Sequence, residues 1–238
     1  IVAKEGKIFL GSDMVSLEST TKRHYMYPHD PDYVEEMSHP DFDEHLDLAI
    51  HAGRATKEEV LKHVRGEISL KSIRDPFKTV NYSAIYGVGV PKLSREGGFS
   101  RSEASTLLST YWERNWSVKV IAKEQYVKTL KDGTMWLKNP VSGFYHSLRF
   151  EKDIFSTLNQ STGVYCFDTF VAYCAAAGVE IPMQYHDEIL VECDDDEQSI
   201  NDTKERLQNA IAKTNEKVKL NVKLSIDVQT GHNYAQCH

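Results

Sequence analysis

The sequence predicts an α+β fold, in which an antiparallel sheet packs against helices and a mostly helical segment is inserted between its strands. Apolar residues alternate with polar ones in 220–228, as in a strand with one buried face. Two short apolar runs flank a turn at 186–187 and form an expected hairpin. The stretch 153–177 reads as one long helix. A chain of 238 residues is long enough to bury a large core around these elements.

The first half of the chain is predicted to be helical after one short strand. The strand is 7–11, and the helical segments are 17–27, 41–52, 57–64, 74–87 and 100–114. Ser100 and Glu103 form a capping-box signature, which marks the start of the last of these helices. In the segment before it, we expect Asp75 to cap the helix, Pro76 to occupy its first turn and Gly87 to end it.

The second half is predicted to contain two hairpins, two long helices and a final strand. In chain order these are strands 127–130 and 135–138, a helix at 153–177, strands 181–185 and 189–193, a helix at 197–215, and the strand 220–228. An Asp-Gly pair at 132–133 favours the first hairpin turn. Four acidic residues at 194–197 favour a helix start there, because carboxylates stabilise the positive end of the helix dipole.

Composition limits the classes of protein. With 28 basic and 35 acidic residues the net charge is -7, which argues against broad nonspecific DNA affinity and leaves room only for a local basic cleft. The longest nearly apolar stretch, 171–181, is too short to span a membrane, for which about 20 residues are needed. Four cysteines without a C-x-x-C pair indicate buried or free thiols in a reducing cytoplasm. The chain lacks an initiating Met and a secretory pattern, so we expect it to be a fragment.

Three segments carry residues suited to chemistry. Asp13 follows an apolar run, and Asp187 sits at the expected hairpin tip. Two strand-borne acids far apart in the chain suggest a two-metal site. In 74–87, cationic and phenolic side chains recur every four residues, which places them on one helical face. These residues are Arg74, Lys78, Tyr82 and Tyr86.

Together, the three segments resemble motifs A, B and C of the A-family DNA polymerases, the group of bacterial DNA polymerase I and phage replicative polymerases. The resemblance covers most of the chain. It implies a palm formed by 1–50 and 151–238 and a fingers insertion at 51–150, with the thumb and the exonuclease domain absent. Phage polymerases end almost as 231–238 does, which implies that His238 is the authentic C-terminus and packs near the active site.

The resemblance implies template-directed DNA synthesis by nucleotidyl transfer from a deoxynucleotide to a primer 3′-hydroxyl. Asp13, Asp187 and the backbone carbonyl of Met14 would hold two Mg²⁺ ions, for which Mn²⁺ can substitute. Glu188 and Lys78 would complete the catalytic group. Taken singly, an Asp after a strand is more often a turn residue or a helix cap.

The same resemblance implies a nucleotide site. Arg74 and Lys78 would bind the triphosphate near the positive end of their helix. Tyr82 would stack near the sugar and base, with good acceptance of dideoxynucleotides, and Tyr86 near the nascent pair. Alternatively, this is an exposed basic helix face with half-buried aromatics. His45, within a segment similar to the family's D-x-H, would contact the triphosphate, or would be a solvent-exposed helical residue.

Two further positions concern sugar and DNA recognition. Glu18 occupies the family's sugar gate and favours deoxynucleotides. Gln160 stands in a Q-x-x-G segment whose Gln reads the minor groove, where acceptors occur at the same places for every correct pair. The remaining DNA contacts implied by the resemblance are those of Asn159, His186, Lys152 and Arg149.

The implied partners are template-primer DNA, deoxynucleotides and an N-terminal polymerase part that carries the thumb, with or without an exonuclease domain. We expect no membrane partner, a phage source and a location in the host cytoplasm. Three alternatives remain: a single-subunit RNA polymerase, a noncatalytic palm and fingers module that binds DNA, and a metal-dependent nuclease. Glu18 and Glu188 favour DNA over RNA synthesis, because the RNA enzymes usually have Gly and Ser at these positions.

Overall fold

The computed structural model describes residues 1–237 and divides into two compact units. Unit 1 comprises Ile1–His24, Asn139–Phe144 and the chain from Asn159 onward. Unit 2 comprises Tyr25–Lys138 and Tyr145–Leu158. The predicted position of His238 lies outside the described residues, and the assignment of chain segments to palm and fingers stays a prediction.

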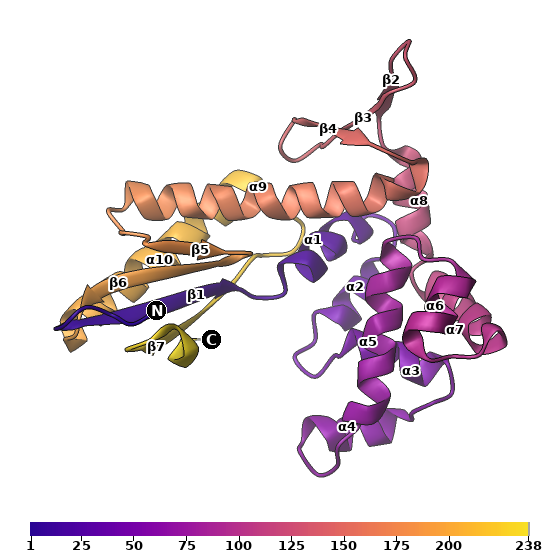
Figure 1. The fold of residues 1–238 in the computed structure, drawn as a ribbon, viewed down its shortest axis with the longest axis horizontal. Coiled ribbons are helices and arrows are strands. Elements are labelled where there is room, and N and C mark those ends of the chain that lie inside the picture. Colours follow the sequence, from indigo (N-terminus) through magenta and orange to yellow (C-terminus); the bar gives the residue numbers. More distant parts are fainter. Residues whose placement is uncertain (238) are drawn as a thin grey trace. The chain divides into compact units, whose positions relative to one another are not determined.

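Unit 1 is built on a four-stranded antiparallel sheet with the strand order β5-β6-β1-β7 (Figure 1). The strands are β1 Lys7–Met14, β5 Met183–Tyr185, β6 Glu188–Asp194 and β7 Ile226–Gly231. The first and last parts of the chain therefore lie side by side, since β1 pairs with both β6 and β7. The sheet and its helices confirm the predicted α+β class.

Helices cover one face of this sheet. They are α1 Leu17–Met26, α9 Ile154–Ala176 and α10 Glu197–Val218. Leu10 of β1, Ile189 of β6 and Phe170 of α9 are completely buried in the resulting core. Each such side chain contributes roughly 1.5–3 kcal/mol through loss of apolar surface from water. Asp196 caps α10 by accepting from the Ser199 amide at 2.9 Å, as the acidic run predicts.

Unit 2 consists of short helices and a small antiparallel sheet. The helices are α2 Pro31–Met37, α3 Glu44–His51, α4 Lys57–Val64, α5 Lys71–Ile85, α6 Val90–Gly97, α7 Arg101–Arg114 and α8 Trp116–Glu124. The strands, in order of pairing, are β2 Val127–Thr129, β3 Met135–Lys138 and β4 Tyr145–Leu148. The predicted capping box is present, because Ser100 and Glu103 bond each other's amides at the start of α7. No helix within residues 1–237 is both long and apolar enough to cross a membrane.

The core of unit 2 lies around α5. Val80 and Ala84 of this helix are fully buried together with Tyr111 of α7. At the rim, Arg114 stacks 3.8 Å from the Tyr33 ring centroid, and its Nε donates to Asp47 Oδ2 at 3.0 Å. A cation–π contact of this kind contributes about 0.5–2 kcal/mol. This contact joins α7 to α2, and the hydrogen bond to Asp47 joins α7 to α3.

The helix α5 begins one turn earlier than predicted. It starts at Lys71, and Pro76 lies inside it, so the prediction that Asp75 caps the helix and Pro76 occupies its first turn is wrong. A proline inside a helix removes one backbone hydrogen bond and usually breaks the helix. Here Phe77 and Val80, one and four residues after Pro76, are buried, and this burial offsets the loss.

The final strand is shorter than predicted and starts at Ile226. The reason is Asn215 of α10, whose side-chain amide donates to the Leu224 carbonyl and whose Oδ1 accepts from the Leu224 amide, at 2.9 and 2.8 Å. These bonds hold 220–225 as a loop despite its alternating pattern. The helices α2, α6 and α8 and the strand β4 were not predicted at all.

Candidate active site

Strand pairing brings the acidic residues of unit 1 to one end of its sheet. Asp13 near the end of β1 lies opposite Glu188 of β6 on one side and Asp227 of β7 on the other. Directly paired residues share a face of the sheet, so these three carboxylates form a row. The Met14 amide donates to the Asp187 carbonyl at 3.1 Å, which places the backbone of Asp187 beside the end of β1.

The turn between β5 and β6 sets the position of Asp187. Tyr185 pairs with Glu188, so the turn contains only His186 and Asp187. His186 has a φ of 54°, in the left-handed region that tight hairpin turns require. Its ring meets the Tyr185 ring edge-on at 4.4 Å between centroids. His186 is exposed at the tip, and Asp187 is half-buried next to β1.

Glu188 is a buried carboxylate held by the C-terminal segment. It is 3% exposed, and its Oε2 accepts from the Tyr234 hydroxyl at 3.0 Å. Burial, and then this hydrogen bond, raise the pKa of Tyr234, so the phenol stays protonated and keeps donating. Gly11 makes room for the arrangement: a Cβ there would lie 2.9 Å from Glu188 Oε1 and 2.7 Å from the Cys237 carbonyl oxygen.

The donors at this end of the sheet suit a hard cation. Asp13 is exposed and can turn its carboxylate to a ligand, and Mg²⁺ prefers oxygen donors of this kind. Among residues 1–237, no three His, Cys, Asp or Glu side chains are arranged as a metal-binding group. The metal site formed by Asp13, Asp187 and the Met14 carbonyl therefore stays a prediction. Its donors are all oxygen atoms, as Mg²⁺ prefers.

Two helices of unit 1 are joined next to this end of the sheet. Asn159 of α9 is 2% exposed, and its Nδ2 donates to the Glu18 carbonyl in the first turn of α1 at 3.0 Å. Gly163 lies against Leu17, since a Cβ there would be 3.5 Å from two Leu17 carbons. Gln160 is exposed beside the buried Asn159. The DNA contacts of Gln160 and Asn159 stay predictions.

In unit 2, α5 presents the predicted face. Arg74 Nε donates to Asp43 Oδ2 at 2.5 Å, and Asp43 Oδ1 caps α3 by accepting from the His45 and Leu46 amides. Burial alone would raise the pKa of Asp43, but the bonds from Arg74 and the Leu46 amide outweigh it and lower that pKa. The ion pair thus ties the start of α3 to α5.

His45 lies beneath this face and is neutral at pH 7. It is 4% exposed, its Nδ1 lies 3.2 Å from Asn81 Nδ2, and burial lowers its pKa. Its ring centroid is 5.7 Å from that of Tyr82, over which Lys78 Nζ lies at 5.9 Å. The structure thus brings His45, Lys78 and Tyr82 together within unit 2. The alternative of a solvent-exposed His45 does not agree with its burial.

The C-terminal end of α5 exposes its aromatics and leads into a close backbone turn. Tyr82 is 43% and Tyr86 40% exposed. Gly87 follows with a φ of 69°, and a Cβ there would lie 3.4 Å from Lys152 Cδ. Lys152 therefore packs its stem beside this turn, while Arg149 is exposed three residues earlier.

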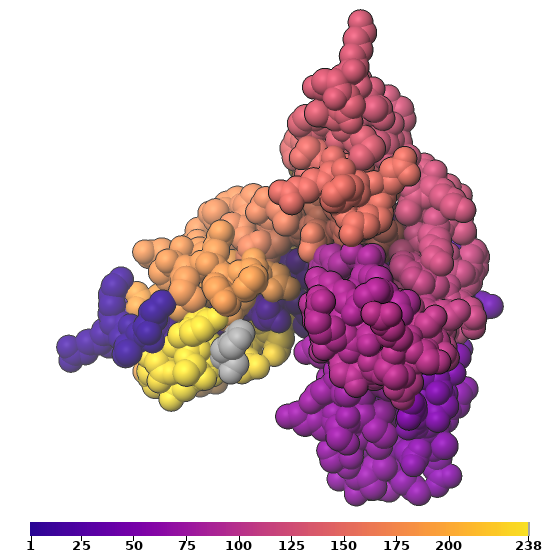
Figure 2. Space-filling model, turned by 45° about the vertical axis from the view of Figure 1, so that its right-hand side comes forward, coloured from indigo at the N-terminus to yellow at the C-terminus, as the bar shows by residue number. Residues whose placement is uncertain are grey.

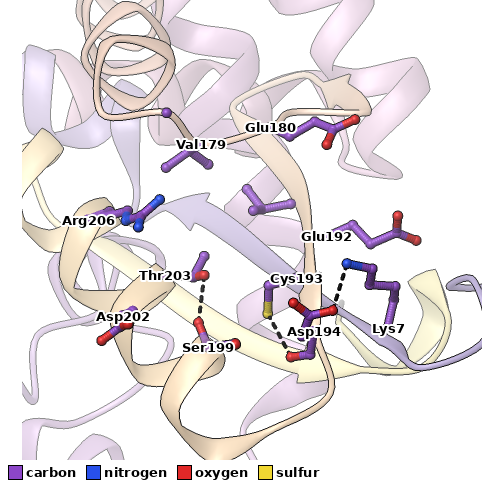
Figure 3. Close-up of a pocket in the computed structure, with 12 residues that line it drawn as sticks. Lys7, Val179, Glu180, Glu192, Cys193, Asp194, Ser199, Asp202, Thr203 and Arg206 are labelled. Carbon is purple, nitrogen blue, oxygen red and sulfur yellow. Dashed lines mark hydrogen bonds and ion pairs between the residues drawn. The ribbon is translucent and has the colours of Figure 1, made fainter.

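A pocket of about 280 Å³ lies elsewhere in unit 1, between β6 and α10 (Figure 3). It is at the opposite end of β1 from Asp13, where Lys7 Nζ lies 2.7 Å from Asp194 Oδ1. None of the predicted site residues lines it. Four acidic and two basic side chains line it, so it is not suited to an anion.

Sequence reasoning missed two neighbours of the predicted acids. Asp227 is opposite Asp13, and Tyr234 donates to Glu188. Alternation in 220–228 did indicate that Asp227 points away from the core. Its closeness to Asp13 depends on β7 pairing with β1, for which the sequence holds no local signal.

The sequence was compared with protein-family models and with curated proteins. No protein-family model matches the sequence. A stretch of 102 residues is 32% identical to DNA polymerase I of Helicobacter pylori (strain ATCC 700392 / 26695), covering 42% of this chain and 11% of that protein. The chain thus matches only a small part of its curated relative.

Among solved structures, the POL domain of Pol1 from M. smegmatis, in complex with DNA primer-template and dNTP, has the same fold. Its TM-score is 0.73 at 19% sequence identity, and the match covers all of this chain and 42% of that one. The fold is that of a DNA polymerase I polymerase domain, as the motifs implied.

Proposed function

We propose that this relative of DNA polymerase I catalyses template-directed DNA synthesis, with transfer of a nucleotide from a deoxynucleoside triphosphate to a primer 3′-hydroxyl. The observation that carries the proposal is the pairing of β1 with β6, which places Asp13 beside the turn that holds Asp187. A structural carboxylate pair would explain this closeness. It would not explain the cationic and aromatic face of α5, which the same chain also contains.

Unit 1 supplies the residues for metals. Two Mg²⁺ ions, when bound, would activate the attacking hydroxyl and neutralise the leaving pyrophosphate, a role in which Mn²⁺ can substitute. Asp13 and Asp187 would hold them through carboxylate oxygens, with the Met14 carbonyl as a third donor. Glu188 keeps its orientation because Tyr234 donates to one of its oxygens. It lies directly opposite Asp13 in the pairing of β1 with β6.

Unit 2 supplies the residues for the triphosphate. A guanidinium has five N–H donors, and the bond from Arg74 to Asp43 uses only Nε, so its terminal nitrogens can donate to phosphate. Lys78 adds a second positive charge and can donate a proton to the leaving group. His45, neutral and held by Asn81, offers a hydrogen bond to phosphate once a nucleotide reaches it.

Sugar and base recognition involves three more residues. Tyr82 and Tyr86 have exposed rings for stacking near the incoming base and the nascent pair. Glu18 lies in the first turn of α1, and its backbone is fixed by Asn159. It acts as the gate that favours deoxynucleotides.

Each unit supplies residues that contact the DNA. Gln160 reads the minor groove, and Asn159 supports it, while His186 contacts the primer end. Lys152 and Arg149 contact the backbone. The substrate partner is template-primer DNA, and an N-terminal polymerase part with the thumb completes the grip that a chain of net charge -7 lacks. The resemblance to phage polymerases supports a phage source and a location in the host cytoplasm.

Primer extension tests the proposal. The chain is assayed with Mg²⁺, alone and with the N-terminal part of its polymerase, using deoxynucleotides or ribonucleotides. Extension with deoxynucleotides, lost in Asp187→Asn, is expected. Shortening of the primer by Mg²⁺ alone would indicate a nuclease, and extension with ribonucleotides an RNA polymerase. No extension with the N-terminal part bound would favour a noncatalytic module.

A further inference from the structure

The small sheet of unit 2 carries aromatic and basic side chains on one face. Lys128 pairs with Trp136, and Lys138 pairs with Tyr145. The Tyr126 carbonyl accepts from the Lys138 amide at 3.2 Å and continues the ladder. Paired residues, and residues two apart on one strand, share a face. The face, which we call the platform, consists of Tyr126, Lys128, Trp136, Lys138 and Tyr145.

The opposite face of the sheet contains its two buried residues, Leu137 and Leu148, so the platform is the more exposed of the two faces. Leu137 is 0% and Leu148 8% exposed, whereas Tyr126 is 60% and Tyr145 47% exposed. The β2–β3 turn projects from the end of α8 (Figures 1 and 2). Exposed aromatic side chains that lie on the same face of a sheet are unusual on a protein surface and indicate a binding surface.

The charge of this segment differs from that of the whole chain. Residues 125–152 contain five Lys and Arg and two Asp and Glu, in a chain of net charge -7. Lys138 Nζ lies 6.0 Å from the Tyr145 ring centroid, so cation and ring are neighbours. A ligand that fits both must be an anionic chain that also offers flat apolar faces.

We propose that the platform binds single-stranded DNA. Bases stack on the exposed rings of Tyr126 and Tyr145, next to the half-buried Trp136, and phosphates contact Lys128 and Lys138, as in sheet surfaces that bind unpaired nucleic acid. Duplex DNA does not satisfy this surface, because its bases are stacked on one another. The inference rests on the proposed function for the choice of DNA, and it gives the unpaired template strand a binding surface on unit 2.

Fluorescence anisotropy of a labelled oligo-dT strand of about 12 nucleotides tests the proposal on the full chain, within the site sizes of known stacking surfaces. The double variant Tyr126→Ala/Tyr145→Ala is expected to raise the Kd roughly tenfold or more. Lys128→Ala/Lys138→Ala is expected to reduce the slope of log K against log salt by about 1.4, at about 0.7 for each phosphate contact. Circular dichroism verifies that these exposed positions leave the fold intact.

Matched controls distinguish DNA binding by the platform from a general effect of removing exposed tyrosines or lysines. Tyr27→Ala removes a tyrosine that is 40% exposed outside the sheet, and Lys213→Ala/Lys217→Ala removes two exposed lysines of α10. Both are expected to bind like the wild type. A loss of single-strand binding in these controls equal to that in the platform variants would overturn the platform.

The result is independent of catalysis. Single-strand binding that depends on the platform, without primer extension by any preparation, supports the platform and counts against DNA synthesis. Primer extension together with unchanged single-strand binding in Tyr126→Ala/Tyr145→Ala overturns the platform and leaves the proposed function in place.

Discussion

Replacing Gly11 by alanine is predicted to destabilise unit 1 and to disturb Glu188 in the same step. The added Cβ would lie 2.7 Å from the Cys237 carbonyl oxygen, 2.9 Å from Cys237 Cβ and 2.9 Å from Glu188 Oε1. Carbon contacts are favourable only near 3.5–4.0 Å. The C-terminal segment or the buried carboxylate must therefore move, and overpacking of this kind costs about 1–3 kcal/mol.

Urea unfolding followed by circular dichroism measures the cost of Gly11→Ala as a lower midpoint at unchanged slope. Gly89→Ala is the matched control, because its Cβ would lie 3.7 Å from Pro91 Cδ and its φ of -88° suits alanine. A chain truncated after Gln236 lacks Cys237, which makes two of the three close contacts. The loss of unfolding free energy caused by Gly11→Ala should therefore be smaller in the truncated chain than in the full chain, by about 0.5–3 kcal/mol. A Gly11→Ala midpoint equal to that of the wild type would refute the reasoning.

Three further predictions concern unit 2. Asp43→Ala removes the cap of α3 and the partner of Arg74, and should lower the free energy of unfolding in urea by about 1–2 kcal/mol; an unchanged midpoint would show that neither bond matters. Burial lowers the pKa of His45, so stability should hold above a pH of about 6.5 and fall below it, less steeply in His45→Gln; identical pH profiles would contradict this. Tyr82→Phe should reduce dideoxynucleotide acceptance in chain-termination assays, and equal termination ratios would exclude a role for the hydroxyl.

Local signals in the sequence predicted those parts of the fold that depend on neighbours in the chain. The capping box of Ser100 and Glu103 marked the start of α7, and the Asp-Gly turn at 132–133 marked the hairpin of β2 and β3. The helix α6 begins next to a proline and ends at Gly98, which adopts the left-handed conformation. The proline and the glycine in the sequence could have predicted this helix, but they were not used.

Signals of this kind do not extend to pairing between distant segments. The start of α5 at Lys71 depends on burial of Phe77 and Val80 against other helices, which outweighs the cost of Pro76. The row of Asp13, Glu188 and Asp227 depends on strand order. The repeat of cationic and phenolic residues at every fourth position of α5 did predict their common face. The ion pair between Arg74 and Asp43 could not be predicted, because it depends on the packing of α3 against α5.

The bonds between α3 and α5 have a mechanical consequence. Arg74 of α5 donates to Asp43 at the start of α3, and Asn81, two turns further along α5, donates through Nδ2 to the Glu44 carbonyl at 3.2 Å. Because two separate hydrogen bonds join the helices, α3 resists both sliding along α5 and rotation against it. If α5 moves during a catalytic cycle, α3 must move with it, and the hinges must lie outside the α3–α5 segment, as at Gly87 after α5, where the backbone is left-handed.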